Sequence, residues 1–271
     1  MLFDAYSDTP NTYNPKNLSE RDKGLDMSVA VISPLGMSPP VVTAFVDYLG
    51  GVRDLVVITT ADKRVKEGFE LIKVAMKIRY PKTRIHEIEL PFEDVTNEEQ
   101  NFEFMRIAGR VIKRQKEKFG SDIVYLNVAG GRKNMCITLS ILGQFLNVDG
   151  IFHVVSPDVK VVNETLENLR PDIERIYLAN EEEEKMRIYR EKERYFDSLL
   201  FPKDYEVVRI PTIPIPQDYI RRLVDVIFNE KLDSLTYSEK EMLLRHGLVE
   251  KAGNKLRVTE FGRKFAEVLV R

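Results

Sequence analysis

Several features that mark common protein classes are absent from this sequence of 271 residues. Its single cysteine, Cys136, excludes a disulfide scaffold and a cysteine zinc site, and is typical of a protein in a reducing cytosol. No apolar run approaches the roughly 20 residues that a membrane-spanning helix needs. The first 26 residues also lack the apolar stretch of a signal peptide. We therefore expect a soluble cytoplasmic protein without membrane contact.

An excess of charge of either sign is absent as well. The 41 Lys and Arg residues nearly cancel the 43 Asp and Glu residues, which leaves a net charge of -2. This balance argues against a long nucleic acid as partner, because such binding depends on many phosphate contacts. It is compatible with a few cations gathered around a small anion.

Motifs for common cofactors and metals are missing too. G-x-G-x-x-G does not follow the first predicted strand and G-x-x-x-x-G-K-[ST] is absent, which argues against a dinucleotide-binding domain and a P-loop NTPase. His86, His153 and His246 are scattered and form no metal-ligand spacing with Cys136. We expect no cofactor and no metal site.

Short β-branched runs alternate with longer amphipathic stretches from Met27 onward. This alternation predicts an α/β fold, a Rossmann-like and mainly parallel sheet with helices on both faces, over residues 27–178. Strands are predicted at 27–33, 54–60, 83–92, 122–130, 150–156 and 174–179. One helix is predicted to begin with Ser38 as N-cap and Pro39 as first helical residue, and others at 65–80, 97–119 and 132–146.

Three further segments flank this domain. Residues 1–26 form an N-terminal extension without periodicity. Residues 179–216 hold a charged helix, from Asn180 to about Leu200, and a Pro-rich linker or edge segment. Residues 217–271 follow the order helix, helix, hairpin, helix, which predicts a small winged-helix-like domain with Gly253-Asn254 at the hairpin tip. One of the usual three helices before the wing is missing or compressed into 231–236.

Two predicted strand ends carry unusual residues. In parallel sheets, ligands bind beyond the carboxyl ends of the strands. SPLGMSPP at 33–40 contains Gly36, which permits close approach, and the hydroxyl of Ser38. NVAGGRKNM at 127–135 places Gly130-Gly131 and then two cations at the start of a helix. Cations at a helix N-terminus are destabilising by roughly 0.3–1 kcal/mol each because they oppose the helix dipole. An anionic ligand would explain their position. The simpler alternative is that the glycines form a tight turn and the cations are solvated.

Together these stretches, SPLGMSPPVV and YLNVAGGRKNM, followed by a winged-helix-like tail, resemble CRISPR-associated Rossmann-fold (CARF) proteins. Within that group the chain resembles the archaeal CRISPR ring nucleases with a winged-helix-like C-terminal domain. The resemblance implies a homodimer that holds cyclic tetra-adenylate across its two-fold axis. The expected ligand-binding residues are Ser33, Pro34, Gly36, Met37, Thr60, Asp62, Asn127, Gly130, Gly131, Arg132, Asn134 and Met135.

The ring-nuclease resemblance also suggests catalytic residues. Lys133 would stabilise charge on the phosphoryl oxygens, and Ser38 matches the serine of the similar ring nucleases, with Ser33 as a weaker candidate. The ribose 2′-OH would attack its own 3′-phosphate without a metal ion and give linear di-adenylate with a 2′,3′-cyclic phosphate. This reaction would switch off type III CRISPR antiviral signalling.

Other activities known among CARF proteins have weaker support here. Arg-x-x-x-x-His is absent, since Pro81, Val148 and Glu241 precede the three histidines by five residues. Residues 171–185 contain the residue types of a PD-(D/E)-x-K nuclease motif, but Glu183 lies in a predicted charged helix and not in a sheet as that motif requires. Two alternatives stay open: a transcription regulator controlled by cyclic oligoadenylate, and a binder that sequesters the messenger intact. Against the regulator, Glu239 and Glu241 lie where a recognition helix would meet DNA, so we interpret the tail as a dimerisation element.

Overall fold

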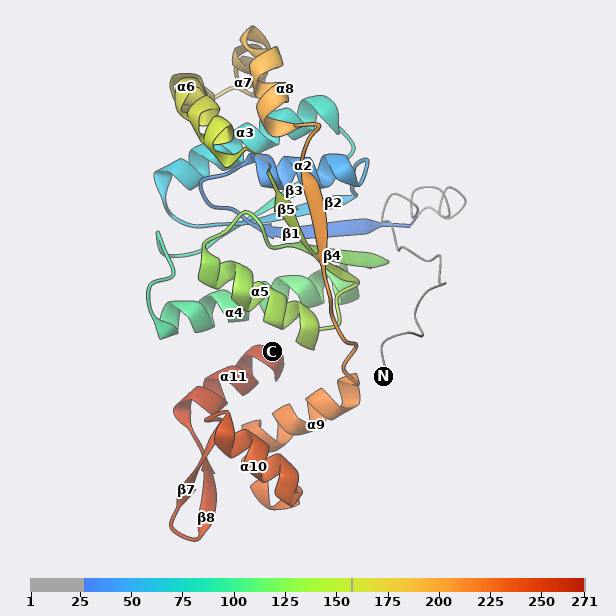
Figure 1. Cartoon of the computed structure of the whole chain (residues 1–271), viewed down its shortest axis with the longest axis vertical. Coiled ribbons are helices and arrows are strands. Elements are labelled where there is room, and N and C mark those ends of the chain that lie inside the picture. The colour runs from blue at the N-terminus through green and yellow to red at the C-terminus, as the bar shows by residue number, and fades with distance from the viewer. Residues whose placement is uncertain (1–26, 157, 271) are drawn as a thin grey trace, which may run out of the picture.

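The computed structural model of the protein describes residues 27–156 and 158–270. The predicted N-terminal extension, residues 1–26, lies outside the described residues. Figure 1 shows an α/β layer structure with a smaller helical unit beneath it, in agreement with the predicted Rossmann-like fold.

A six-stranded sheet forms the centre of the larger unit. Its order is β3-β2-β1-β4-β5-β6, in which the first five strands are parallel and β6 runs antiparallel to β5. The strands are β1 (Val29–Pro34), β2 (Asp54–Thr59), β3 (Arg84–Glu89), β4 (Ile123–Asn127), β5 (Gly150–Val155) and β6 (Glu206–Ile210). Because β2 and β3 lie on one side of β1 and β4 on the other, the strand order reverses between β1 and β4. A crevice for ligands is expected outside the carboxyl ends of these two strands.

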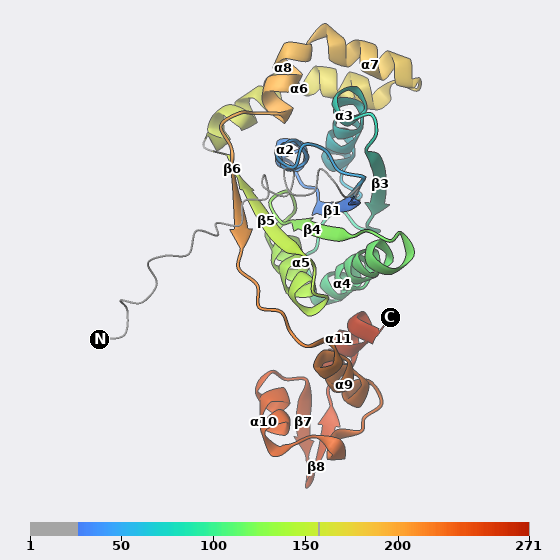
Figure 2. The same cartoon turned by 90° about the vertical axis from the view of Figure 1, so that its right-hand side faces the viewer.

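Helices cover both faces of the sheet (Figure 2). One face packs against α2 (Pro40–Tyr48) and α3 (Lys63–Arg79), and the other against α4 (Glu98–Lys113) and α5 (Lys133–Phe145). β2 and β4 are buried along their whole length. Central parallel strands with helices on both sides are expected to be apolar throughout.

One predicted strand is a helix in the structure. Residues 174–179, predicted as the sixth strand, belong almost entirely to α6 (Val159–Leu178). The local run Ile176-Tyr177-Leu178 resembles a strand, but Leu166, Leu169, Ile173 and Ile176 recur at helical spacing and are all buried. Packing of this stripe in the core beside α3 determines the structure.

The Pro-rich segment supplies the sixth strand instead. The sequence left open whether 201–217 is a linker or an edge segment, and β6 shows that part of it is an edge strand. The charged helix predicted from Asn180 to Leu200 is divided into α7 (Glu182–Glu191) and α8 (Glu193–Leu200) at Lys192, whose backbone angles (φ -128°, ψ 30°) are not helical. Since α7 and α8 pack in the core with α3, the layered unit continues past the predicted boundary at 178.

The C-terminal unit has the predicted winged-helix order. It comprises α9 (Gln217–Phe228), α10 (Tyr237–Arg245), the hairpin β7 (Val249–Ala252) and β8 (Lys255–Val258), and α11 (Glu260–Val270). A 3-10 turn at Leu232–Ser234 occupies the stretch where a compressed helix was predicted.

α11 joins the two units (Figure 1). Phe261 packs edge-on against Phe102 of α4, and Phe265 against Phe145 of α5. Leu269 packs against both the core of the larger unit and the core of the tail. The strap between β6 and α9 is tied to the end of α5 as well, because Asn147 donates to the carbonyl of Ile215 at 2.9 Å. The described residues include no helix that is both long and apolar enough to cross a bilayer.

Candidate anion-binding site at the carboxyl edge of the sheet

The two loops that the sequence singled out lie directly against each other at the point where the strand order reverses. A Cβ added to Gly130 would lie 2.5 Å from the carbonyl oxygen of Pro34, and one added to Gly36 would lie 2.7 Å from the carbonyl oxygen of Gly130. A Cβ on Gly131 would meet the Pro34 ring at 2.7–2.9 Å. The glycines are therefore required for this backbone contact.

The start of α5 is open and cationic. Arg132 is its N-cap and makes no capping hydrogen bond, Lys133 is its first residue, and the first turn contains no acid. Lys133 is exposed and has no hydrogen-bond or ion-pair partner among the residues that the structure describes. The uncapped amides of the first helical residues, Lys133 and Asn134, the helix dipole and a free ammonium group together favour an anion at this position.

Ser38 and Ser33 differ in their access to this region. Ser38 is partly exposed, and within the described ranges its hydroxyl has no partner. The prediction that Ser38 caps α2 is wrong, because Pro39 is the N-cap and the helix begins at Pro40. Two consecutive prolines fix this start without a side-chain cap. Ser33 is fully buried and donates to the carbonyl of Pro34 at 3.3 Å, so Ser38 is the more available hydroxyl.

Four of the predicted ligand-binding residues have clear structural roles. Asn127 is fully buried and donates to the carbonyl of Val41 at 3.0 Å, and it accepts from the amide of Ala129. Asn134 donates to the carbonyl of Val95 at 2.5 Å. Met135 is a core residue, and Asp62 caps α3 by accepting from the amide of Arg64.

The remaining predicted residues lie at or beside the two loops. Met37 is exposed, whereas Pro34, Gly36 and Gly130 are buried in the contact between the loops. Thr60, which follows β2, is almost fully buried, and its hydroxyl has no hydrogen-bond partner in the described part of the chain.

Sequence reasoning missed the loop that follows β3. Asp94 in this loop approaches Arg132, with 3.3 Å between Oδ1 and Nε. The sequence did contain a signal, because this acid follows a parallel strand and so belongs to the same edge of the sheet as Gly36 and Gly130.

Cys136 lies in the first turn of α5. Burial raises the pKa of its thiol, and this outweighs the opposite effect of hydrogen bonds from the amides of Gly131 and Cys136. The thiol therefore stays neutral at pH 7 and adds no negative charge to the site.

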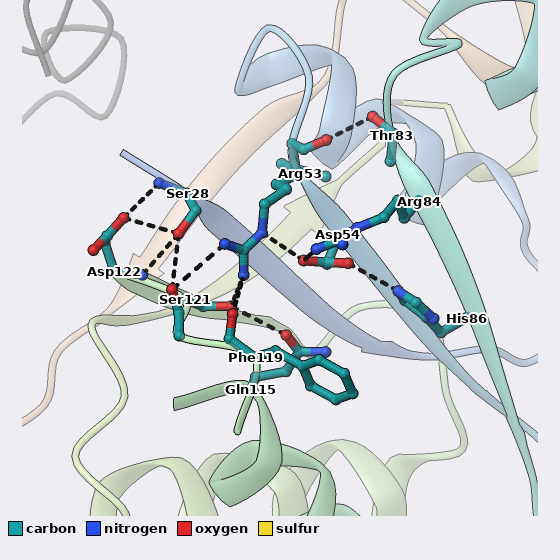
Figure 3. Close-up of polar contacts among 12 residues, drawn as sticks. Ser28, Arg53, Asp54, Thr83, Arg84, His86, Gln115, Phe119, Ser121 and Asp122 are labelled. Atoms are coloured by element: carbon teal, nitrogen blue, oxygen red, sulfur yellow. Dashed lines mark hydrogen bonds and ion pairs between the residues drawn. The ribbon is translucent and has the colours of Figure 1, made fainter. Parts of the chain in front are cut away.

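A second polar cluster lies at the opposite edge, where the parallel strands begin (Figure 3). Asp54 is buried and is contacted by Arg53 and Arg84 at 2.7 Å and by His86 at 2.8 Å. Burial alone would raise the pKa of the Asp54 carboxyl, but hydrogen bonds from Arg84, His86 and Arg53 outweigh it and lower the pKa. These contacts join β2 and β3, and Arg53 also binds the carbonyl of Phe119, so the cluster supports the sheet at the edge away from the anion site.

His86 and His153 lie in β3 and β5, as predicted. In the residues that the structure describes, no three His, Cys, Asp or Glu side chains are grouped so that they could hold a metal ion.

Residues 38–243 match the family described as CRISPR-associated protein NE0113, and residues 217–271 match the family described as CARF-associated HTH. A curated relative is the CRISPR system ring nuclease SSO2081 of Saccharolobus solfataricus. It is 25% identical over 138 residues, which are 48% of this chain and 73% of that protein.

Solved structures show only distant similarity. Enterococcus italicus Csm6 bound to cyclic hexa-2′-fluoro-hexa-dAMP has a TM-score of 0.46 and 14% identity, and the match covers 77% of this chain and 49% of that chain. Can2 of Sulfobacillus thermosulfidooxidans in complex with cyclic tetra-adenylate has a TM-score of 0.34 and 11% identity, and the match covers 89% and 63%. This chain thus spans about half of the first protein and less than two thirds of the second.

Proposed function

The chain belongs to the family of CRISPR-associated protein NE0113, and from this premise we propose that it is a ring nuclease that degrades a cyclic oligoadenylate. The observation that carries the proposal is the uncapped, cationic start of α5. It lies against the loop after β1, which glycines allow to approach closely, at the point where the strand order reverses. The similarity to a ring nuclease at 25% identity agrees with it. The proposed substrate is cyclic tetra-adenylate, whose degradation would end type III CRISPR signalling.

The phosphate-binding step follows from the position of Lys133. Its ammonium group and the amides at the start of α5 would bind the non-bridging oxygens of one phosphate. Ser38 follows the buried Gly36 by two residues, a span of at most about 7 Å. Since Gly36 contacts Gly130, the hydroxyl of Ser38 is well placed to donate to the same phosphate or its ribose.

Cleavage would be an internal transfer that needs no metal ion. The 2′-oxygen forms a bond to phosphorus while the bond from phosphorus to the 5′-oxygen breaks. The 2′-proton leaves to solvent, and the departing 5′-oxygen takes a proton from water. Two such events in cyclic tetra-adenylate give two linear di-adenylates with 2′,3′-cyclic phosphate ends. Lys133 would stabilise the charge that develops on the phosphoryl oxygens.

The rate should be modest because no histidine belongs to this site. His86 contacts Asp54 at the opposite edge of the sheet, and the predicted serine–lysine pair contains no general base. A positioned base typically adds about 10²–10⁴-fold to a rate. A slow enzyme suits the removal of a signal after the response has begun.

A second copy of the chain would complete the pocket. Ile137 and Ile141 share one side of α5 and are 61% and 45% exposed. Gln144 continues this side and bonds to the backbone of Ile213, which is 78% exposed. We propose that this apolar stripe packs against its counterpart in a homodimer, since a contiguous exposed patch of this kind marks protein–protein contact.

The decisive experiment is incubation of the protein with cyclic tetra-adenylate in excess EDTA. The expected product is di-adenylate with a cyclic phosphate end, identified by mass spectrometry. Lys133→Ala should slow single-turnover cleavage by about 10²–10³-fold, as removal of one charge-stabilising group does in other enzymes.

Lys160 provides a matched control. It is an exposed lysine in the first turn of α6, the helix after β5, just as Lys133 begins the helix after β4. Lys160→Ala should cleave at the wild-type rate. Intact cyclic tetra-adenylate after long incubation with excess wild-type protein would contradict the proposal and would favour a sequestering binder.

A second candidate function, binding of duplex nucleic acid by the tail, is favoured by the distribution of charge. Among the tail residues that the structure describes, four cations lack an ion pair, and all lie on α10 or the hairpin: Lys240, Arg245, Lys251 and Lys255. Glu239, which the sequence placed where a recognition helix meets DNA, is instead buried: its side chain is 10% exposed, pairs with Arg222 and belongs to the capping box of α10. A recognition helix and wing with unpaired cations suit phosphate contacts.

This candidate is tested with a labelled short DNA duplex in a fluorescence anisotropy titration at low salt. Arg245→Glu with Lys251→Glu should abolish salt-sensitive binding. Lys231→Glu should preserve it, since Lys231 lies outside α10 and the hairpin and near Asp225. A flat wild-type titration would remove this function and leave the tail as a dimerisation element.

A further inference from the structure

The anion site carries a fixed negative group that sequence reasoning did not anticipate. Asp94 and Arg132 pair at 3.3 Å while their side chains are 38% and 43% exposed, so both can reach a ligand in solvent. The closest approach in this contact is from Nε of Arg132, and the guanidinium group donates no hydrogen bond within the described residues, so it can still donate to a phosphate.

The loop holds Asp94 in place. Asp94 Oδ1 also accepts from the amide of Val95 at 2.7 Å. The Val95 side chain is buried, and its carbonyl accepts from Asn134 in the first turn of α5 at 2.5 Å. Two residues further on, Asn97 caps α4. These bonds hold Asp94 beside the start of α5.

We infer that Asp94 competes with the ligand phosphate for Arg132 and thereby sets the affinity of the site, an inference that rests on the proposed function. The carboxylate lowers the net charge at the start of α5 from that of two cations to that of one. In a two-fold dimer this happens twice around one ring. The consequence is weaker binding of substrate and faster release of the anionic products than the cations alone would give.

The experiment uses isothermal titration calorimetry to compare the dissociation constants of wild type and Asp94 variants for cyclic tetra-deoxyadenylate. This ligand lacks the attacking 2′-hydroxyl and so is not cleaved. Asp94→Asn and Asp94→Ala should both bind the ligand about five- to tenfold more tightly than wild type, since each removes a negative charge that repels the nearby phosphate. The plot of affinity against salt concentration should steepen, because each subunit engages a further cation. A merely structural role for Asp94 predicts weaker binding instead.

Two variants serve as controls. Asp94→Glu keeps the charge and should bind like wild type. Glu93→Gln removes the adjacent exposed acid, which has no ion pair with Arg132, and should change the dissociation constant by less than about twofold.

A second probe, inorganic tripolyphosphate, separates the inference from the proposed function. If wild type ignores the ring but Asp94→Asn binds tripolyphosphate more tightly than wild type, the ring-nuclease proposal fails and the inference stands. If Asp94→Asn binds neither probe more tightly than wild type, the inference is overturned.

Discussion

The contact between the two loops allows a sharp test through one added methyl group. In Gly130→Ala the new Cβ would lie 2.5 Å from the carbonyl oxygen of Pro34, about 0.9 Å short of the 3.4 Å at which ordinary contact begins. The obstacle is backbone at the end of β1, which cannot rotate away as a flexible side chain would. The β1 loop and the start of α5 must therefore separate.

The size of the effect follows from this displacement. Overpacking of this kind costs about 1–3 kcal/mol, which for a chain of this size lowers the melting temperature by about 5 °C. The fold should survive, but a displacement near 1 Å in a site that depends on alignment costs about 100-fold in rate. We expect a folded Gly130→Ala protein whose single-turnover cleavage of cyclic tetra-adenylate is about 100-fold slower than that of wild type.

Gly109→Ala is the matched control. Gly109 lies within α4, and its added Cβ would make ordinary contacts of 3.6 and 3.7 Å with Val268. Replacing glycine by alanine in a helix stabilises by about 0.5–1 kcal/mol, so this variant should cleave normally and melt no lower than wild type. Circular dichroism with single-turnover assays checks both proteins. Wild-type cleavage by folded Gly130→Ala would refute the proposed alignment of the two loops.

Three further predictions concern other parts of the molecule. Ser38→Ala should lower the single-turnover rate about tenfold without changing the melting temperature, since a hydrogen bond to a charged group contributes about 1.5–3 kcal/mol at most; an unchanged rate would exclude this serine. Asp54→Asn should destabilise the protein by about 3 kcal/mol at pH 7. Because the folded pKa of Asp54 is lowered, this contribution is present above the unfolded pKa of about 3.9 and is lost as pH falls through the folded value. Urea titrations should therefore show the difference from wild type shrinking below about pH 4, and a constant difference would contradict the assignment. Ile141→Asp should convert the proposed dimer to monomer in light scattering and abolish cleavage, whereas an unchanged dimer would place the interface elsewhere.

The sequence predicted the sheet well where one strand is fully apolar and is followed by a clear helix. β2, β4 and β5 fall within their predicted ranges for this reason, and β1 extends one residue beyond its range, to Pro34. It failed at 174–179, where the local residues favour a strand but the stripe from Leu166 to Ile176 packs as a helix. No local pattern could show that β6 would come from a Pro-rich segment, because an edge strand depends on its neighbour, β5, for pairing.

The candidate site was predictable to a similar degree. Glycines and cations at two strand ends indicated that the loops after β1 and β4 belong together, and the backbone contact confirms that they adjoin. The pairing of Arg132 with Asp94 depends on a long-range arrangement of three loops, which spacing along the chain does not reveal. The buried position of Glu239 was missed for the same reason, since its partner Arg222 lies on another helix.

The docking of α11 has a consequence for how the molecule could act on a second ligand. Leu269 belongs to both hydrophobic cores, and Lys113 of α4 donates to its carbonyl at 2.7 Å. The tail, residues 217–270, is thus packed firmly against the larger unit, and we expect the two to unfold in one cooperative transition. In a two-fold dimer the two α10 helices would then be held at one fixed separation. A duplex that contacts both helices would then be selected by the spacing of its half-sites, because the dimer could not adjust to a different spacing.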